Sequence, residues 1–134
     1  MMLKYLLDTN ICIYAIKRKP VQVRRALNAH RGQVAISAVT LMELFYGAEK
    51  SSSPRGNLEV IEGFAARLIV LAYDNAAAYC TAQLRAEQAA GGTPIGAYDQ
   101  MIAGHARSQG LTVVTNNLRE YARVPGLVLE DWSS

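Results

Sequence analysis

The chain has 134 residues, of which 51% are hydrophobic and 19% charged, and fourteen Lys and Arg against eleven Asp and Glu leave a formal net charge of +3. This length suits a single domain, residues 1–134, and the apolar content excludes an intrinsically disordered chain. Because no apolar run reaches the roughly 18 residues that span a bilayer and the N-terminus lacks the apolar region of a signal peptide, we expect a soluble cytoplasmic protein.

The first half of the chain alternates short apolar runs with helical patterns of hydrophobic residues. Its predicted elements are, in order, a strand at 4–7, helices at 11–17 and 21–30, a strand at 34–36, a helix at 41–50 and a loop at 51–56. Asp8 ends the first strand and opens a segment rich in helix-capping residues.

The second half continues the alternation. Its predicted elements are a helix at 57–67, a buried strand at 68–71, helices at 74–90 and 95–109, a strand at 111–114, a short helix from 116–117 and a strand at 127–129. Most of the strands are continuous apolar runs, which is typical of a parallel sheet covered on both faces. The sequence therefore predicts a three-layer α/β/α domain with a five-stranded, mainly parallel sheet.

Acidic and amide side chains fall where such a sheet binds its ligands, beyond the carboxyl ends of the strands. They are Asp8 after the first strand, Glu43 in the first turn of the next helix, Asp99 early in the helix before the fourth strand, and Asn116, Asn117 and Glu120 after that strand. We expect these side chains to converge on one edge of the sheet.

Several acids also have a purely structural interpretation. Asp8 can serve as a helix N-cap, and Glu43 can form a capping box with Thr40. Asp99 is harder to explain in this way, because it falls on an apolar helical stripe where a carboxylate is costly unless it is paired or metal-bound. Asp74 is expected to be only a helix cap, and Glu130 and Asp131 are expected to be surface residues.

Carboxylates that gather in one place repel one another, and a divalent cation removes that penalty. Oxygen ligands without Cys or His favour Mg²⁺, with Mn²⁺ as an alternative, over Zn²⁺. Six basic residues lie between positions 17 and 31, a composition that suits phosphate but also a solvated helix face. Cys12 and Cys80 are expected to be free thiols.

Four blocks of sequence, taken in order, resemble the PIN-domain ribonucleases, and specifically the VapC-type toxins of toxin–antitoxin pairs. The blocks are Tyr5-Leu6-Leu7-Asp8-Thr9-Asn10, residues 36–47 with Glu43-Leu44 and Gly47, residues 92–103 with Asp99, and Val114-Thr115-Asn116-Asn117-Leu118-Arg119-Glu120-Tyr121; residues 124–127 resemble the closing strand. Each block is weak alone, whereas their order and spacing are specific.

The resemblance implies roles for these residues. Asp8 and Asp99 would be the metal ligands, and Glu43 would complete the catalytic cluster. Many family members carry an Asp where this chain has Asn116-Asn117. Asn116 is the candidate for that catalytic position, Asn117 or Glu120 could complete the cluster instead, and Thr115 could bond a water or phosphate.

The resemblance also implies partners. It points to a Mg²⁺-dependent endoribonuclease that forms a homodimer, cleaves structured RNA such as tRNA, and is inhibited by a VapB-type antitoxin filling the active-site groove. Tyr14, Tyr46 and Tyr98 could stack on RNA bases or serve in the core or a dimer contact. The alternative function is a catalytically degenerate PIN domain that only binds RNA or protein.

Overall fold

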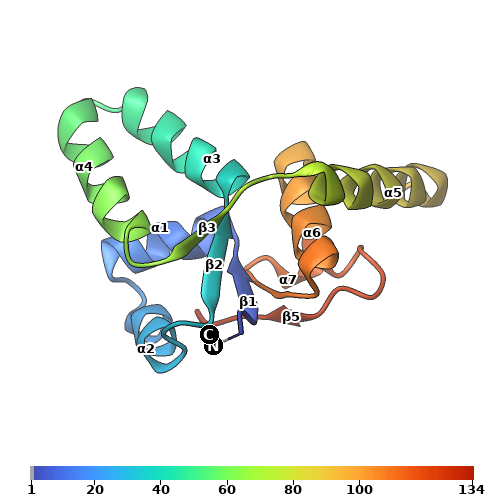
Figure 1. The fold of residues 1–134 in the computed structure, drawn as a ribbon, viewed down its shortest axis with the longest axis horizontal. Helices are drawn as coiled ribbons and strands as arrows, with labels where there is room; N and C mark the ends of the chain where they lie inside the picture. The colour runs from blue at the N-terminus through green and yellow to red at the C-terminus, as the bar shows by residue number, and fades with distance from the viewer. Residues whose placement is uncertain (1) are drawn as a thin grey trace.

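The structure, a computed structural model, describes residues 2–134; Met1, the first residue of the predicted domain, lies outside them. Across this range one sheet contains five strands, all parallel, in the order β3-β2-β1-β4-β5 (Figure 1). The strands are β1 (Tyr5–Leu7), β2 (Val34–Ser37), β3 (Ile69–Leu71), β4 (Thr112–Val114) and β5 (Leu129–Glu130). The predicted parallel sheet is confirmed.

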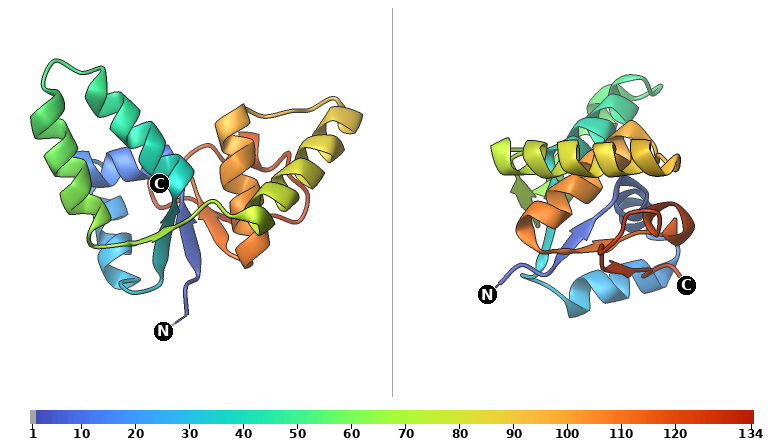
Figure 2. Two further views of the ribbon diagram at one scale, coloured as in Figure 1. Left: turned by 45° about the horizontal axis from the view of Figure 1, so that its top comes forward. Right: turned by 90° about the vertical axis from the view of Figure 1, so that its right-hand side faces the viewer.

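Helices cover both faces of the sheet. They are α1 (Thr9–Lys17), α2 (Val21–Ala29), α3 (Ala38–Glu49), α4 (Pro54–Ala65), α5 (Asn75–Gly91), α6 (Ala97–Gln109) and α7 (Leu118–Tyr121). Figure 2 shows α1 to α4 on one side of the strands and the α5–α6 pair on the other. Within residues 2–134, no helix is both long and apolar enough to cross a membrane.

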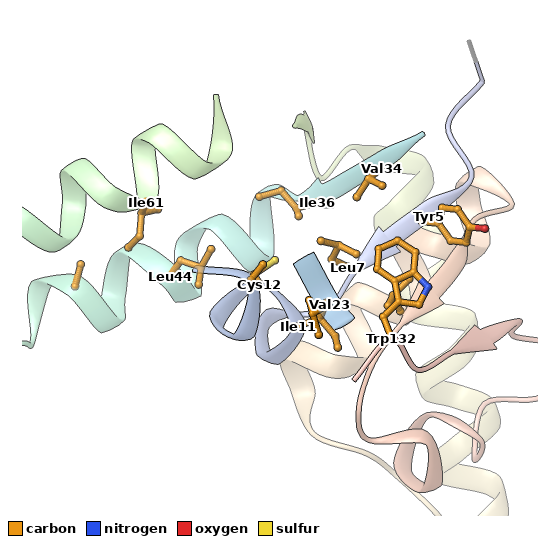
Figure 3. Close-up of a cluster of buried hydrophobic side chains, with 13 residues drawn as sticks. Tyr5, Leu7, Ile11, Cys12, Val23, Val34, Ile36, Leu44, Ile61 and Trp132 are labelled. Atoms are coloured by element: carbon orange, nitrogen blue, oxygen red, sulfur yellow. The ribbon is translucent and has the colours of Figure 1, made fainter. Parts of the chain in front are cut away.

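Each face of the sheet has its own hydrophobic core. Tyr5 and Leu7 of β1 point into a cluster with α1 to α4, part of which Figure 3 shows, whereas Leu6 points into a second cluster with α5 and α6. Successive strand residues face opposite sides, so a strand buried on both sides is apolar throughout. The three-layer architecture is therefore confirmed. Cys12, in the first cluster, and Cys80 are both free thiols.

The predicted burial of the strand at 68–71 is wrong. Ile69 and Val70 are 51% and 37% exposed. The reason is the position of β3 at the edge of the sheet, where it pairs with β2 only. An apolar run therefore lies on the surface along this edge.

Three predicted boundaries shift. α3 begins at Ala38, three residues before the prediction, and α4 begins at Pro54 inside the predicted loop. Proline is well suited to the first position of a helix because it lacks the N–H that has no partner there. The last strand lies at Leu129–Glu130, two residues later than its predicted start.

An aromatic cluster packs the C-terminal segment against the sheet. The indole of Trp132 stacks on His30, with ring centroids 5.3 Å apart, and meets Tyr5 edge to face at 5.0 Å. Its Nε1 donates to Glu130 Oε1 at 3.0 Å. These contacts fix the segment after β5 and therefore the position of Asp131.

Gly104 allows α5 and α6 to pack closely. A Cβ atom added there would lie 2.6 and 2.7 Å from the Thr81 Cα and N atoms. Because the obstacle is backbone, Gly104→Ala is expected to lower the free energy of unfolding by about 1–3 kcal/mol or more, as overpacked cores do. Urea denaturation measures this loss.

Gly56→Ala is the matched control, because Gly56 lies in α4 with nothing within 4 Å of its added Cβ. Alanine in an exposed helix is more favourable than glycine by about 1 kcal/mol, so this variant should be unchanged or slightly stabilised. Equal stability of Gly104→Ala and the wild type would contradict the close packing.

Candidate active site

Asp8 occupies the centre of the carboxyl edge of the sheet. It directly follows β1, the middle strand, and its backbone N–H donates to Val114 O at 2.9 Å. Its Oδ1 accepts the Ile11 N–H at 2.9 Å, so it is the N-cap of α1. The capping role is therefore real, and it also fixes the carboxylate at the strand end.

Burial raises the pKa of the Asp8 carboxyl from its usual 3.8 to about 6, against hydrogen bonds from Thr115 and Ile11 that lower it. The nearby charges of Glu43 and Asp131 raise this pKa further. Thr115 Oγ1 accepts the Asn117 N–H at 2.9 Å, which leaves its own proton for Asp8. Asp8 is only 4% exposed, so the charged form has little solvation by water.

The predicted capping box at Glu43 is wrong. Ser37 caps α3, accepting the Val39 N–H at 3.1 Å, so Thr40 lies inside the helix and Glu43 in its second turn. The cause is that β2 runs into α3 without a loop, so that Ser37, the last strand residue, is the first side chain able to cap. Glu43 Oε1 instead accepts from Thr9 Oγ1 at 2.6 Å, which holds it beside the residue that follows Asp8.

Asp99 and Glu120 form a carboxyl pair beside the same edge. Burial, then the hydrogen bond shared with Glu120, raises the pKa of Asp99 to about 7. The Gly96 N–H, at 3.1 Å, and Asn117 Nδ2, at 2.6 Å, donate to Glu120, and with Asp99 they lower the pKa of Glu120. Asp99 is therefore the weaker acid of the pair, and its Oδ1 accepts from Tyr121 Oη at 3.1 Å.

Asn116 presents an unpaired oxygen. Its Nδ2 donates to Tyr14 Oη at 3.0 Å, whereas its Oδ1 is buried and has no hydrogen-bond partner. A buried carbonyl oxygen without a donor is rare and calls for an explanation, of which an absent ion is one. Asn117 has a different function, because its side chain holds Glu120.

The structure thus places the predicted residues in two linked groups. Asp8 lies near Glu43 and Thr115, and Asp99 pairs with Glu120, with enough charge interaction between Asp8 and Asp99 to raise the pKa of Asp99. Tyr46 and Tyr98 are 63% and 51% exposed, which excludes core packing for both.

Three residues at this edge were not predicted from the sequence to be site residues: Thr9, Tyr121 and Asp131. Asp131 was expected at the surface but is half-buried and raises the pKa of Asp8. It follows β5 as Asp8 follows β1, so the strand-end rule would have identified it had the last strand been placed correctly.

The oxygen atoms at this edge fit a magnesium ion. Among residues 2–134, no group of three or more His, Cys, Asp or Glu side chains is arranged to hold a metal ion. Mg²⁺, however, takes one or two carboxylates and keeps several waters. Asp8, which is buried, and Asp99, which is half-buried, supply two carboxyls with raised pKa values, and Asn116 Oδ1 supplies a neutral oxygen. This donor set suits Mg²⁺ or Mn²⁺ and lacks the nitrogen and sulfur ligands of zinc sites.

An apolar groove opens beside this edge. It has a volume of about 320 Å³ and is lined by Glu43 at one position and mainly by apolar side chains of α1, α3 and α4, among them Ile13, Ile16, Leu44, Val60 and Ile61. The groove therefore brings an apolar surface up to a candidate catalytic carboxylate.

Residues 5–127 match the PIN domain family. The chain is 63% identical over 132 residues to the tRNA(fMet)-specific endonuclease VapC of Shigella flexneri, covering 98% of this chain and all of that relative. It is 48% identical to the ribonuclease VapC2 of Haemophilus influenzae, covering 98% and 99%. The crystal structure of DNA-bound VapBC from Salmonella typhimurium contains a chain 60% identical, with a TM-score of 0.94 and coverage of 98% and 99%.

Proposed function

Because this chain belongs to the PIN-domain family, and within it to the VapC-type toxins, we propose that it is a Mg²⁺-dependent endoribonuclease that hydrolyses phosphodiester bonds in tRNA. The observation that carries this proposal is the pair of carboxyls, buried Asp8 and half-buried Asp99, with raised pKa values at the carboxyl edge of the sheet. The relatives named for tRNA(fMet) support a tRNA substrate, and a tRNA substrate in turn supports action in the cytoplasm.

The residues of the site divide the work of hydrolysis. Asp8 and Asp99, with Asn116 Oδ1, would hold Mg²⁺ (or Mn²⁺), which supplies Lewis-acid polarisation of the scissile phosphate and lowers the pKa of the attacking water. Thr115 orients the Asp8 carboxylate through its hydroxyl. Glu120, held by Gly96 and Asn117, keeps a negative charge beside Asp99.

Glu43 is the proposed proton acceptor of the reaction. One of its oxygens is occupied by the Thr9 hydroxyl at 2.6 Å, which fixes the carboxylate and leaves the other oxygen for an attacking water. In this proposal Glu43 is the general base, and its position depends on a residue that neighbours the metal ligand Asp8.

The direct test is cleavage of labelled tRNA(fMet) by the purified protein with Mg²⁺ and with EDTA. Cleavage only with Mg²⁺ or Mn²⁺ is expected. Cleavage that persists in EDTA would contradict the metal requirement. Binding of tRNA without any cleavage would instead favour the degenerate PIN domain.

Glu43→Gln is expected to lower kcat by about 10²–10⁴-fold, the contribution of a general base, with little change in thermal stability. Gln retains an oxygen that can accept from Thr9, so only the proton acceptor is lost. Glu49→Gln, an exposed substitution on the same helix, is the control and should retain activity. Full activity of Glu43→Gln would exclude Glu43 as the general base and leave it only a structural role as the hydrogen-bond acceptor of Thr9.

Two surfaces support the proposed protein partners. The apolar groove beside Glu43 suits an antitoxin segment that blocks the site, and the relatives in solved structures include VapBC from several species. The edge strand β3, where Val70 is exposed, suits a homodimer contact, because exposed edge strands are usually covered. Light scattering that gives a monomer mass would contradict the dimer.

A further inference from the structure

A second and larger groove carries a concentration of arginines. It lies between the end of α1, α2 and α4, has a volume of about 780 Å³, and is lined by Arg18, Arg24, Arg31 and Arg67. Its remaining lining is apolar or neutral, and includes Leu27, Asn28, Val34, Phe64 and Ile69; no acid lines it. Four positive charges therefore face one concave surface.

These arginines have no carboxylate partners. Among residues 2–134 the one ion pair is Arg107–Glu87, on the opposite side of the sheet. Within the groove, Arg24 donates only to the Ala15 carbonyl at 3.5 Å and Arg31 only to Asn28 Oδ1 at 3.4 Å. Unpaired like charges repel one another, and an anionic ligand would relieve that repulsion.

Arg18 is held in an unfavourable backbone conformation. Its φ of 61° is the one positive φ of a non-glycine residue within residues 2–134. It is the C-cap of α1, and glycine adopts this left-handed conformation with the least steric strain. Strain at a single residue often marks a functional position, and here the strained residue lines the groove.

The arginine groove extends from the apolar groove beside Glu43 toward the amino ends of β2 and β3, where Val34 and Ile69 line it. Asp8 and Arg18 cap the two ends of α1, which places their backbones about 15 Å apart at 1.5 Å per residue. The apolar groove beside Glu43 and the arginine groove share Ile16 and Val60. Each strand of a B-form duplex rises about 3.4 Å per nucleotide, so about 15 Å corresponds to roughly four nucleotides.

We propose that the arginine groove binds the phosphodiester backbone of the substrate RNA, beginning about four nucleotides from the cleaved bond. Arginine forks match phosphate oxygens, and a nucleic-acid strand presents a phosphate at every nucleotide. An acidic peptide, by contrast, carries carboxylates only where its sequence has Asp or Glu, so a groove lined by several arginines favours RNA. The inference rests on the proposed function and adds to it a binding site remote from the acids.

The test measures tRNA(fMet) binding against salt concentration in an Asp8→Asn background, which prevents cleavage. Each lost phosphate contact lowers the slope of log affinity against log salt by about 0.7–0.9. Arg24→Gln/Arg31→Gln is therefore expected to lower the slope by about 1.5 and to weaken binding on the order of tenfold at low salt. Arg25→Gln/Arg85→Gln removes the same charge outside the groove and should change the slope less.

Arg18→Gly separates binding from folding. Relief of the positive φ is expected to raise the urea midpoint, or leave it unchanged, while RNA affinity falls. If the variant lost RNA binding because it misfolded, the urea midpoint and the RNA affinity would both fall. With RNA that has fewer than four nucleotides on each side of the cut, the wild type and Arg24→Gln/Arg31→Gln should bind with equal affinity.

Equal salt slopes for the groove variant and its control would overturn the inference and leave the proposed function standing. Unchanged RNA binding with weakened antitoxin binding would also overturn it and assign the groove to a protein partner. Failure of every variant to bind tRNA would overturn the proposed function and the inference together.

Discussion

Asp8→Asn is expected to lower tRNA cleavage by about 10²–10³-fold or more, the usual cost of removing one preorganised electrostatic group. The variant should remain folded, because Asn caps helices as well as Asp does and its Oδ1 can still accept the Ile11 N–H. The loss therefore reports the charge of Asp8 and not the start of α1. Single-turnover kinetics with saturating Mg²⁺ measure it.

Asp74→Asn is the matched control for this experiment. Asp74 caps α5 in the same way, with its Oδ1 accepting the Ala77 N–H at 2.9 Å, but it lies outside the acidic site. Its activity should equal that of the wild type. Equal activity of Asp8→Asn and Asp74→Asn would mean that Asp8 is a helix cap alone, and the proposed metal site would fail.

The metal-free protein is expected to lose stability as the pH rises from 5 to 8. The folded state raises the pKa of Asp8 to about 6 and that of Asp99 to about 7, above the usual 3.8. A group with a raised folded pKa stabilises the fold below its unfolded pKa and loses that contribution as the pH passes the folded pKa. Asp8 alone gives a loss of about 1–2 kcal/mol in this window.

Urea denaturation in EDTA at pH 5, 6, 7 and 8 measures this loss. Asp8→Asn should flatten the profile because it removes one of the two titrating carboxyls, whereas Asp74→Asn should not. Millimolar Mg²⁺ at pH 8 should raise the wild-type midpoint, since a cation offsets the repulsion. The lowered pKa of buried His105 opposes this trend in the wild type, so the comparison of variants decides: identical profiles for Asp8→Asn and Asp74→Asn would contradict the raised pKa of Asp8.

The fold was predictable because burial on both faces leaves a strong local signal. Residues 34–36 are apolar without alternation, as are residues 111–114 apart from Thr112, and this pattern is typical of a covered parallel strand. The strand at 69–71 carries the same signal at the edge of the sheet. Local sequence does not contain the strand order, so it cannot distinguish an apolar edge strand from a central one.

The errors near the site have the same origin. Ser37 and Thr40 are both good N-caps, and the choice between them depends on how far β2 extends, which its pairing with Leu71 of β3 determines. Asp131 became a site neighbour because Glu130 pairs with Val114 of β4. Acids next to a clear strand, such as Asp8, were identified, whereas those whose strand is defined by long-range pairing were not.

The packing of Trp132 provides a built-in spectroscopic probe. Trp132 is the sole tryptophan of the chain and only 8% exposed, and its ring lies against Tyr5 of the central strand and His30. Its fluorescence therefore reports whether the C-terminal segment remains docked. Asp131 precedes it, so the emission also follows the segment that carries this acid during urea titrations, with no label added to the protein.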